Sequence, residues 1–318
     1  MKLAATAATA PARALANFPA NFRRFAWAVV IYNVAVILWG ALVRATGSGA
    51  GCGGHWPFCN GDVVPELAAM ATVIEFTHRI MSGLAFVGVA VLFVWARKIA
   101  PVGHAVRRWA AWSLGFIVLE ALLGAGLVLF GFVAQDRSTG RLIYLGLHLS
   151  NTLALLGALT IAARSAERNA ASRYARYAVS TKLKFTLGVV MLVAVAGAIT
   201  ALGDTLFPSR TLVDGIQADF SPTADFLVKL RVIHPVLAIS VSFLLVSMAW
   251  PVFKARQTLE LRKRSVWVMG SVVAAICAGA LTIGLRAPVW SQLIHLGIAD
   301  MLWISLVLFA AELSAPSS

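Results

Sequence analysis

The sequence carries little charge, and little of that charge is negative. Only 13 of the 318 residues are Asp or Glu, against 27 Lys or Arg, and charged residues make up 13% of the chain while 60% are hydrophobic. This composition excludes an ordinary soluble domain and is typical of a polytopic protein in a lipid bilayer. The net charge of +14 is therefore attributed to basic cytoplasmic loops, and no nucleic-acid partner is predicted.

Cysteine is also scarce, with three residues in the chain. There is no Cys-x-x-Cys-His segment, so a covalently attached c-type haem is not expected. Cys52 and Cys59 share a loop that contains Gly and Pro. A disulfide could close there in an oxidising compartment, as a structural cross-link or as a redox-active pair. Cys277 lies within an apolar run, where we expect it only to pack.

No secretory signal is recognisable, because residues 1–24 lack a short apolar core followed by a cleavage site. We expect these residues to form a cytoplasmic tail. Beyond them, eight apolar runs are each long enough to cross a bilayer, which takes about 20 residues. The runs are 25–43, 74–96, 110–133, 142–163, 185–203, 232–252, 266–285 and 291–311. The predicted fold is an all-α integral membrane protein with eight transmembrane helices.

The loops between the runs predict the orientation in the membrane. An even number of spans puts both termini on one side. The segments on that side (1–24, 97–109, 164–184 and 253–265) carry 19 Lys or Arg, whereas the opposite loops and helix ends carry 8. The positive-inside rule then places both termini in the cytoplasm and the protein in the cell inner (plasma) membrane.

Two long outer loops, 44–73 and 204–231, each follow an odd-numbered span, which suggests an internal duplication. We predict two pseudo-symmetric four-helix bundles, at 25–163 and 185–311. A cytoplasmic linker at 164–184 would join them, and a cytoplasmic tail would follow at 312–318. Small residues on the odd-numbered spans favour close helix packing, namely Gly124, Gly126, Gly197 and Gly279.

Four of the six histidines lie near the outer ends of the even-numbered spans. They are His78, His148, His234 and His295. Imidazole is a common axial ligand of haem iron, and a helical bundle can hold such a ligand between facing helices. We interpret the four as two pairs of haem ligands, one pair in each bundle. Hydrogen bonds to neighbouring helices and a proton relay are the alternatives.

Glu75 lies one helical turn before His78 and therefore shares its face. At that position it could accept a proton or stabilise positive charge, or it could merely favour the start of a helix. Two further intramembrane acids, Glu120 and Asp300, have no role that the sequence assigns. His55 and His104 fall in loops, where no function is expected of them.

Basic residues gather at the same outer helix ends. Guanidinium groups bind carboxylates in a bidentate fork, and haem carries two propionates. The candidate propionate ligands are Arg44, Arg79, Arg210 and Arg231. The alternative is that these side chains reach the membrane interface without binding a ligand.

Six short segments together resemble the haem A synthase family. They are Val43 to Gly49, Cys52 to Gly61 with Trp56-Pro57 inside, Glu75 to Arg79, Leu147 to Leu149, Arg231 to Pro235 and His295 to Asp300. The resemblance covers all eight apolar runs, residues 22–311. The combination of segments is specific, whereas each segment alone is weak.

This resemblance implies an enzyme that oxidises a ring methyl group of haem O to a formyl group in successive steps. The product, haem A, would go to cytochrome c oxidase. His78 and His148 would hold the iron of the substrate haem. His234 and His295 would hold a permanent haem b that relays electrons.

The resemblance also implies that Glu75 assists catalysis and that Cys52 and Cys59 form a disulfide near the substrate. The expected partners are haem O, haem O synthase and the assembly machinery of cytochrome c oxidase. A homo-oligomer is compatible with the sequence.

Two other functions also fit four intramembrane histidines. One is a dihaem membrane cytochrome b that passes electrons between quinol and an outer partner. The other is a transporter or haem-handling chaperone without chemistry. Glu75 favours the enzyme, because an electron carrier has little need of a carboxylate one turn from an iron ligand.

Overall fold

The structure is a computed structural model that describes residues 18–66, 69–167, 180–255 and 258–314. The predicted tails and linker (1–24, 164–184 and 312–318) lie in large part outside the described residues. Every regular element in the described residues is a helix. The helices are α1 (Ala20–Ala45), η1 (Ser48–Ala50), α2 (Met70–Ile99), α3 (Ala105–Leu129), α4 (Thr139–Glu167), α5 (Thr181–Leu206), α6 (Leu212–Asp219), α7 (Phe226–Leu230), α8 (Ile233–Lys254), α9 (Leu259–Gly284) and α10 (Val289–Leu313).

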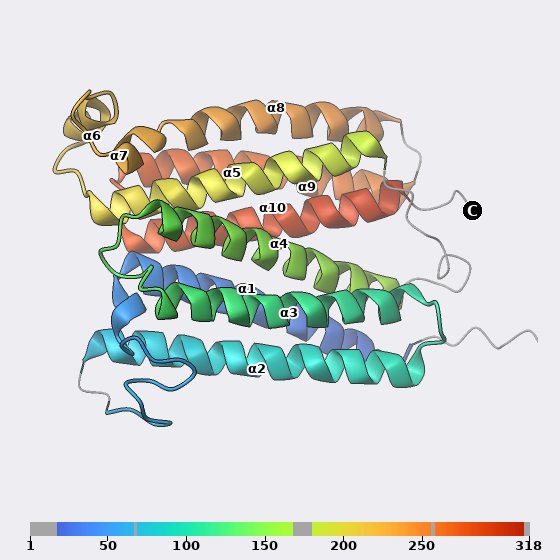
Figure 1. The fold of residues 1–318 in the computed structure, drawn as a ribbon. Coiled ribbons are helices and arrows are strands. Elements are labelled where there is room, and N and C mark those ends of the chain that lie inside the picture. Colours follow the sequence, from blue (N-terminus) through green and yellow to red (C-terminus); the bar gives the residue numbers. More distant parts are fainter. Residues whose placement is uncertain (1–17, 67–68, 168–179, 256–257, 315–318) are drawn as a thin grey trace, which may run out of the picture.

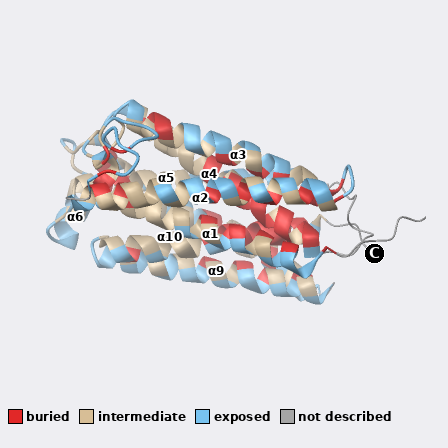
Figure 2. Cartoon of the chain, turned by 90° about the horizontal axis from the view of Figure 1, so that it is seen from below, coloured by how far each residue is buried: buried red, intermediate tan, exposed pale blue. Residues whose placement is uncertain are grey.

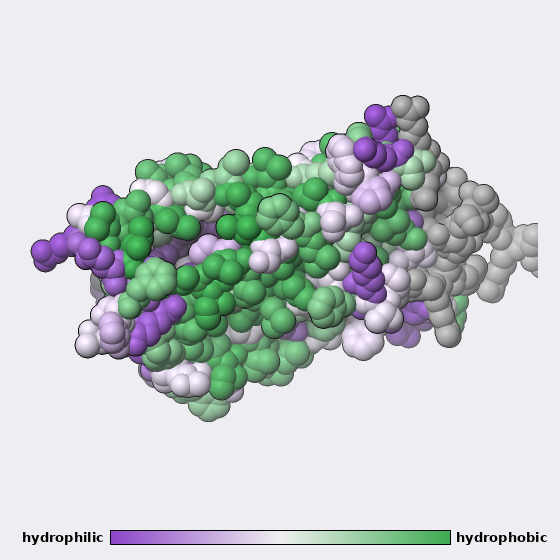
Figure 3. All heavy atoms as spheres, turned by 90° about the horizontal axis from the view of Figure 1, so that it is seen from above, coloured by the Kyte–Doolittle hydropathy of each residue, from purple (hydrophilic) through white to green (hydrophobic). Residues whose placement is uncertain are grey.

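Eight helical segments of the described chain are long and apolar enough to cross a membrane. Seven are single helices, and α7 with α8 forms the eighth, Phe226–Lys254. Apolar side chains cover the middle of the molecule, while hydrophilic ones gather toward its two ends (Figure 3). Lipid tails solvate such a belt, and helices satisfy their own backbone hydrogen bonds inside it. The protein is a multi-pass membrane protein with the all-α fold that the sequence predicts.

The third span ends before its apolar run does. The sequence predicts a helix to residue 133, but α3 ends at Leu129. Gly131 adopts a left-handed φ of +70°, and its N–H donates to the Val128 carbonyl. A glycine in this conformation ends a helix without steric strain. The apolar residue Phe132 packs on Tyr144 instead, with ring centroids 5.3 Å apart.

The spanning helices form two neighbouring groups. In the first group α1 packs on α2 and α4, and α3 packs on α2 and α4. In the second group α5 packs on α8 and α10, and α9 packs on α8 and α10. Contacts of α1 and α4 with α5 and α10 join the groups, and all the spans run roughly along one direction (Figure 1). A pseudo-symmetric relation between the two groups remains a prediction.

The tightly packed core lies toward one end of the bundle. Its largest cluster includes Phe22 and Leu92 at 0% and 1% exposure, with Leu156 and Leu159 at 0%. Figure 2 shows buried residues concentrated at the end where the chain terminates. At the opposite end, where the four candidate histidines lie, interior positions are only partly buried. The interior around the histidines is therefore less completely filled by protein.

The second outer loop is more ordered than its sequence suggests. The sequence predicts a loop at 204–231, but the structure places two short helices there, α6 and α7. The Thr211 and Asp225 side chains accept backbone N–H groups at the helix starts, which is the usual capping arrangement. Helix α6 projects beyond the outer end of α8 (Figure 1).

Candidate functional site

Each candidate ligand histidine lies against a glycine of the preceding or adjacent spanning helix. A Cβ atom on any of these glycines would come close to the facing ring. That atom would lie 3.0 Å from His78 Cε1 at Gly40, 3.7 Å from His148 Cε1 at Gly124, 2.8 Å from His234 Cε1 at Gly197, and 3.2 Å from His295 Cε1 at Gly279. At Gly40, Gly197 and Gly279 a Cβ atom would crowd the imidazole, whereas at Gly124 it would make an ordinary van der Waals contact. A histidine ring therefore faces a glycine in four helix pairs (α1–α2, α3–α4, α5–α8 and α9–α10), and the contact is tight in all of them except α3–α4.

His234 and His295 face one another from α8 and α10. Their ring centroids are 6.3 Å apart and their planes are inclined at 71°. Two imidazoles bound to one metal ion from opposite sides, each at about 2 Å from nitrogen to metal, have centroids roughly 6 Å apart. The observed separation therefore fits two axial ligands of a single haem iron.

His78 and His148 lie on α2 and α4 of the first helix group. The His78 ring lies against Gly40 of α1, and the His148 ring lies against Gly124 of α3. Neither His78 Nδ1 nor His148 Nδ1 has a hydrogen-bond partner in the described residues. Both nitrogens are buried, so the ring pair is poorly satisfied by protein atoms alone.

Glu75 is fixed by partners on two sides. Its Oε2 accepts the N–H of Cys52 at 2.7 Å, and its Oε1 pairs with the Arg79 guanidinium at 2.6 Å. Arg79 also donates to the carbonyls of His55 and Phe58. Glu75 is 3% exposed. The carboxylate therefore connects the helix that carries His78 to the first outer loop.

The disulfide predicted in that loop is present. Cys52 and Cys59 are bonded, with Cα atoms 4.4 Å apart. Cys52 is 0% exposed and Cys59 1%. Because the Cys52 N–H binds Glu75 directly, the disulfide and the carboxylate belong to one cluster.

Arg44 lies where the two helix groups meet. Its guanidinium donates to Thr205 Oγ1 on α5 at 3.1 Å and to Gln292 Oε1 on α10 at 2.9 Å. Gly40, which contacts His78, lies one turn earlier on the same helix, and Gln292 lies three residues before His295. Arg44 therefore stands between the two histidine pairs.

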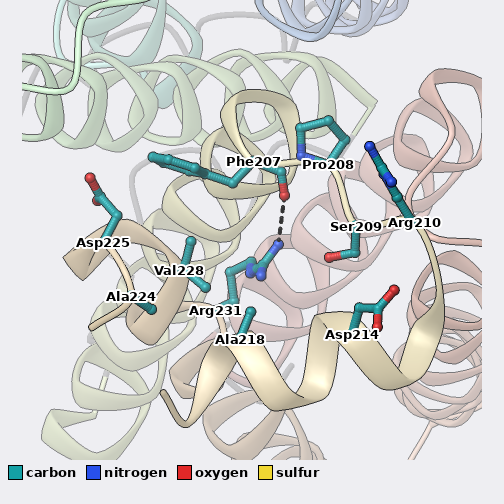
Figure 4. Close-up of a pocket in the computed structure, with 10 residues that line it drawn as sticks. All are labelled: Phe207, Pro208, Ser209, Arg210, Asp214, Ala218, Ala224, Asp225, Val228 and Arg231. Carbon is teal, nitrogen blue, oxygen red and sulfur yellow. Dashed lines mark hydrogen bonds between the residues drawn. The ribbon is translucent and has the colours of Figure 1, made fainter. Parts of the chain in front are cut away.

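Arg231 is held by acidic residues of the second outer loop. Its guanidinium lies 3.1 Å from Asp204 Oδ1 and 2.8 Å from Asp219 Oδ1. It also donates to the Phe207 carbonyl at 3.3 Å, beside a pocket lined by α6, α7 and the segment before α6 (Figure 4). Arg231 lies in the turn between α7 and α8, so it does not share a continuous helical face with His234.

Arg210 lines the same pocket, and its guanidinium has no hydrogen-bond partner among the described residues. Its backbone carbonyl accepts a hydrogen bond from Arg286. The four arginines therefore differ: Arg79 and Arg231 are paired with carboxylates, Arg44 holds neutral groups, and Arg210 is available. Propionate binding by any of them remains a prediction.

Glu120 is brought next to His148, a contact that sequence reasoning missed. Glu120 Oε1 lies 3.3 Å from His148 Nδ1, and Asn151 Nδ2 donates to Glu120 Oε2 at 2.6 Å. Glu120 and Gly124 lie one turn apart on α3, and Asn151 lies one turn after His148. That spacing is the only sequence signal that could have linked them.

The remaining polar residues have simpler places. His104 Nδ1 accepts the Val106 N–H at the start of α3, which agrees with a structural role. Asp300 is 1% exposed on α10, and its Oδ2 has no hydrogen-bond partner within the described chain. Cys277 is an exposed free cysteine on the surface of α9.

The chain is similar to proteins of haem metabolism. It is 42% identical to a protein of Thermus thermophilus named "Protoheme IX farnesyltransferase" over 289 residues, 91% of this chain and 48% of that protein. It is 46% identical over 99 residues to a "Heme A synthase" of Halalkalibacterium halodurans, 31% of this chain and 33% of that protein. A "Heme A synthase" of Geobacillus kaustophilus is 42% identical over 113 residues, 35% of each chain.

These matches cover at most about half the length of the curated relatives. A match to a family model also covers most of this chain. It covers residues 23–307, which contain all four histidines, Glu75 and the disulfide. The chain therefore belongs to the COX15-CtaA family of cytochrome oxidase assembly proteins.

Proposed function

We propose that the protein is a haem A synthase, which oxidises a ring methyl group of haem O to a formyl group. The observation that carries this proposal is the family match over residues 23–307, which includes two histidine pairs whose rings face glycines. The Thermus relative is named for the farnesylation of protohaem, which agrees with a farnesylated haem as substrate. Farnesyl transfer is not proposed here, because this chain spans only 48% of that protein.

We propose that the two pairs hold different haems. His78 and His148 would bind the iron of the substrate haem O, and His234 and His295 would bind a resident haem b. The 6.3 Å separation of the His234 and His295 rings suits opposite axial positions on one iron. When bound, haem b would supply one-electron transfer, by which electrons could pass to or from the substrate site.

Glu75 is proposed to act next to the substrate. Glu75 lies one turn before His78 on α2. Arg79 donates to one of its carboxylate oxygens, and the Cys52 N–H donates to the other. Both contacts orient the carboxylate, so its position relative to His78 is set before the substrate arrives. In that place it can accept a proton or stabilise positive charge beside the reacting carbon.

The four arginines differ as candidate propionate ligands, because some already bind a carboxylate of the protein. A propionate would compete with Glu75 for Arg79, and with Asp204 and Asp219 for Arg231. Arg44 and Arg210 are not hydrogen-bonded to a carboxylate in the described structure, so they are the stronger candidates. Arg44 stands between the two histidine pairs and could serve a propionate from either side.

We also propose the cellular context. The excess of basic residues in the loops on the side of the termini places both termini in the cytoplasm. The histidine pairs would then lie toward the outer face of the plasma membrane, where the disulfide is stable. Haem O synthase would supply the substrate, and cytochrome c oxidase assembly would consume the product.

Extraction of the pigments from purified protein tests the function. Haem O or haem A together with haem b is expected. Haem b alone, in two equivalents, would instead identify a dihaem electron carrier. A protein without haem would point to a transporter or chaperone.

Replacing Gly197 by valine is expected to lower the haem content of the purified protein by about half, because overfilling a packed contact displaces its neighbours. A Cβ at this position would lie 2.8 Å from His234 Cε1. Absorbance of the reduced pyridine haemochrome measures the loss. Gly188→Val on the same helix is the matched control, since nothing lies within 4 Å of its Cβ position. Equal haem content in the two variants would show that the contact of Gly197 with His234 is not needed for haem binding.

The Cys52–Cys59 disulfide is expected to support catalysis as well as the loop. Cys52→Ser should lower haem A production several-fold, and loss of the cross-link should destabilise the fold by about 2 kcal/mol. Haem A output in membranes and thermal unfolding of purified protein measure the two effects. Cys277→Ser, on the surface of α9, is the control. Full activity of Cys52→Ser would leave the disulfide as a structural cross-link only.

A further inference from the structure

The four candidate ligand histidines differ in what lies beside their second ring nitrogen. Only His148 has a carboxylate there among the described residues, with Glu120 Oε1 at 3.3 Å from Nδ1. His234 Nδ1 lies 3.0 Å from the Val193 carbonyl, a neutral partner. His78 Nδ1 and His295 Nδ1 have no hydrogen-bond partner in the described chain. The two proposed haem sites are therefore chemically unequal.

Glu120 is held in place by its own neighbours. Asn151 Nδ2 donates to Glu120 Oε2 at 2.6 Å and also to the Phe116 carbonyl at 2.9 Å. The Thr152 hydroxyl contacts Glu120 Oε1. Asn151 and Thr152 lie three and four residues after His148, so one face of α4 carries both the imidazole and the groups that hold the carboxylate. These contacts fix Glu120 near His148 without help from solvent.

The contact between Glu120 and His148 is electrostatic at the present ring orientation. The distance is within ion-pair range, but the carboxylate lies off the direction of the Nδ1–H, so no hydrogen bond forms. Rotation about the last side-chain torsion of histidine meets only a broad, shallow potential. A modest rotation would align the Nδ1–H with Glu120 while Nε2 points to the bound iron.

We propose that Glu120 is a positioning residue that accepts the Nδ1–H of His148 and so makes this imidazole the more electron-donating ligand. The inference rests on the proposed function, in which His148 binds the iron of the substrate haem. A carboxylate behind a metal-bound histidine fixes the ring and raises its basicity. A more basic axial ligand stabilises the oxidised iron, so it lowers the reduction potential of that haem.

The two haem sites would therefore differ in reduction potential. The haem held by His78 and His148 would have the lower reduction potential for the same porphyrin, because His234 has only a backbone carbonyl behind it. Electrons would then leave the substrate site readily toward the second haem. Glu120, to which the sequence alone assigned no role, would thereby contribute to the direction of electron flow.

The test isolates one haem at a time. In a His234→Ala background, the full-length protein is purified and loaded with protohaem, and the midpoint potential of the haem that remains is measured by spectroelectrochemical titration. Glu120→Gln should shift this potential in the positive direction and leave the haem content unchanged. Glutamine keeps the size and one oxygen acceptor, so a purely structural role predicts no shift. In a His148→Ala background, the same substitution should leave the potential of the other haem unchanged.

A second measurement keeps Glu120 in place, in case the glutamine variant loses haem. His148→Gly is supplied with imidazole or with 1-methylimidazole, which has no N–H to donate. In the His148→Gly protein, the haem should have a lower reduction potential with imidazole than with 1-methylimidazole. This difference between the two ligands should be larger than the same difference in the matched His234→Gly protein. Equal margins in the two proteins would overturn the inference.

The outcomes separate the inference from the proposed function. Absence of any haem in the His234→Ala protein would overturn the proposed function, and this inference with it. A bound haem whose potential does not respond to Glu120→Gln would overturn the inference alone and leave the proposed function standing.

Discussion

Replacing His234 by alanine is expected to remove the resident haem b while the protein remains in the membrane. The side chain is one of two imidazoles whose centroids lie 6.3 Å apart, and loss of either ligand opens an axial position on the iron. About half of the total haem absorbance should disappear, together with the spectrum of a haem bound by two histidines. His295→Ala should have the same effect, since the two residues act on one iron.

The control is another histidine-to-alanine substitution. His55 lies in the first outer loop, and its backbone carbonyl rather than its side chain binds Arg79. His55→Ala should therefore leave the absorbance spectrum unchanged. Persistence of the bis-histidine spectrum in both His234→Ala and His295→Ala would show that these residues do not share a haem.

Replacing Glu75 by glutamine is expected to reduce haem A production by about 100-fold or more, the range in which a positioned acid or base contributes. Haem content should stay near that of the unaltered protein, because Glu75 is not one of the proposed iron ligands. Glutamine keeps an oxygen for the Cys52 N–H, which Glu75 Oε2 accepts at 2.7 Å. The change thus removes the charge while it retains much of the loop attachment. Haem A and haem O are quantified in membranes by chromatography of extracted pigments.

Two controls separate chemistry from anchoring. Glu66→Gln, at an exposed position in the same outer loop, should leave haem A production unchanged. Titration of free thiols in Glu75→Gln should show that Cys52 and Cys59 remain bonded. Unchanged haem A output in Glu75→Gln would remove this residue from the mechanism, and a lost disulfide would identify it as an anchor for the loop.

The glycine contacts suggest why the outer half of the bundle is less tightly filled than the inner half. At the inner end, large side chains such as Phe22 and Leu156 are fully buried in one core cluster. At the outer end, Gly40, Gly124, Gly197 and Gly279 present bare backbone to the histidines. A planar macrocycle between helices needs such room, because side chains that packed the same space would exclude it.

The sequence alone determined the class of fold and the types of residue at the site. Long apolar runs specify membrane spans through local composition, since each helix satisfies its own backbone and exposes its side chains to lipid. The histidines near the ends of alternate spans, the glutamate one turn before His78 and the cysteine pair could all be read from spacing. The end of α3 at Leu129 could not, because apolar residues after Gly131 pack without continuing the helix.

Only the tertiary structure decided which side chains meet. Glu120 and His148 are 28 residues apart on different helices, and their contact at 3.3 Å depends on how α3 and α4 are rotated against each other. Arg231 likewise meets carboxylates from two other helices, Asp204 on α5 and Asp219 on α6. Spacing along one helix fixes a shared face, but contacts between helices depend on packing across the whole molecule, which no local pattern encodes.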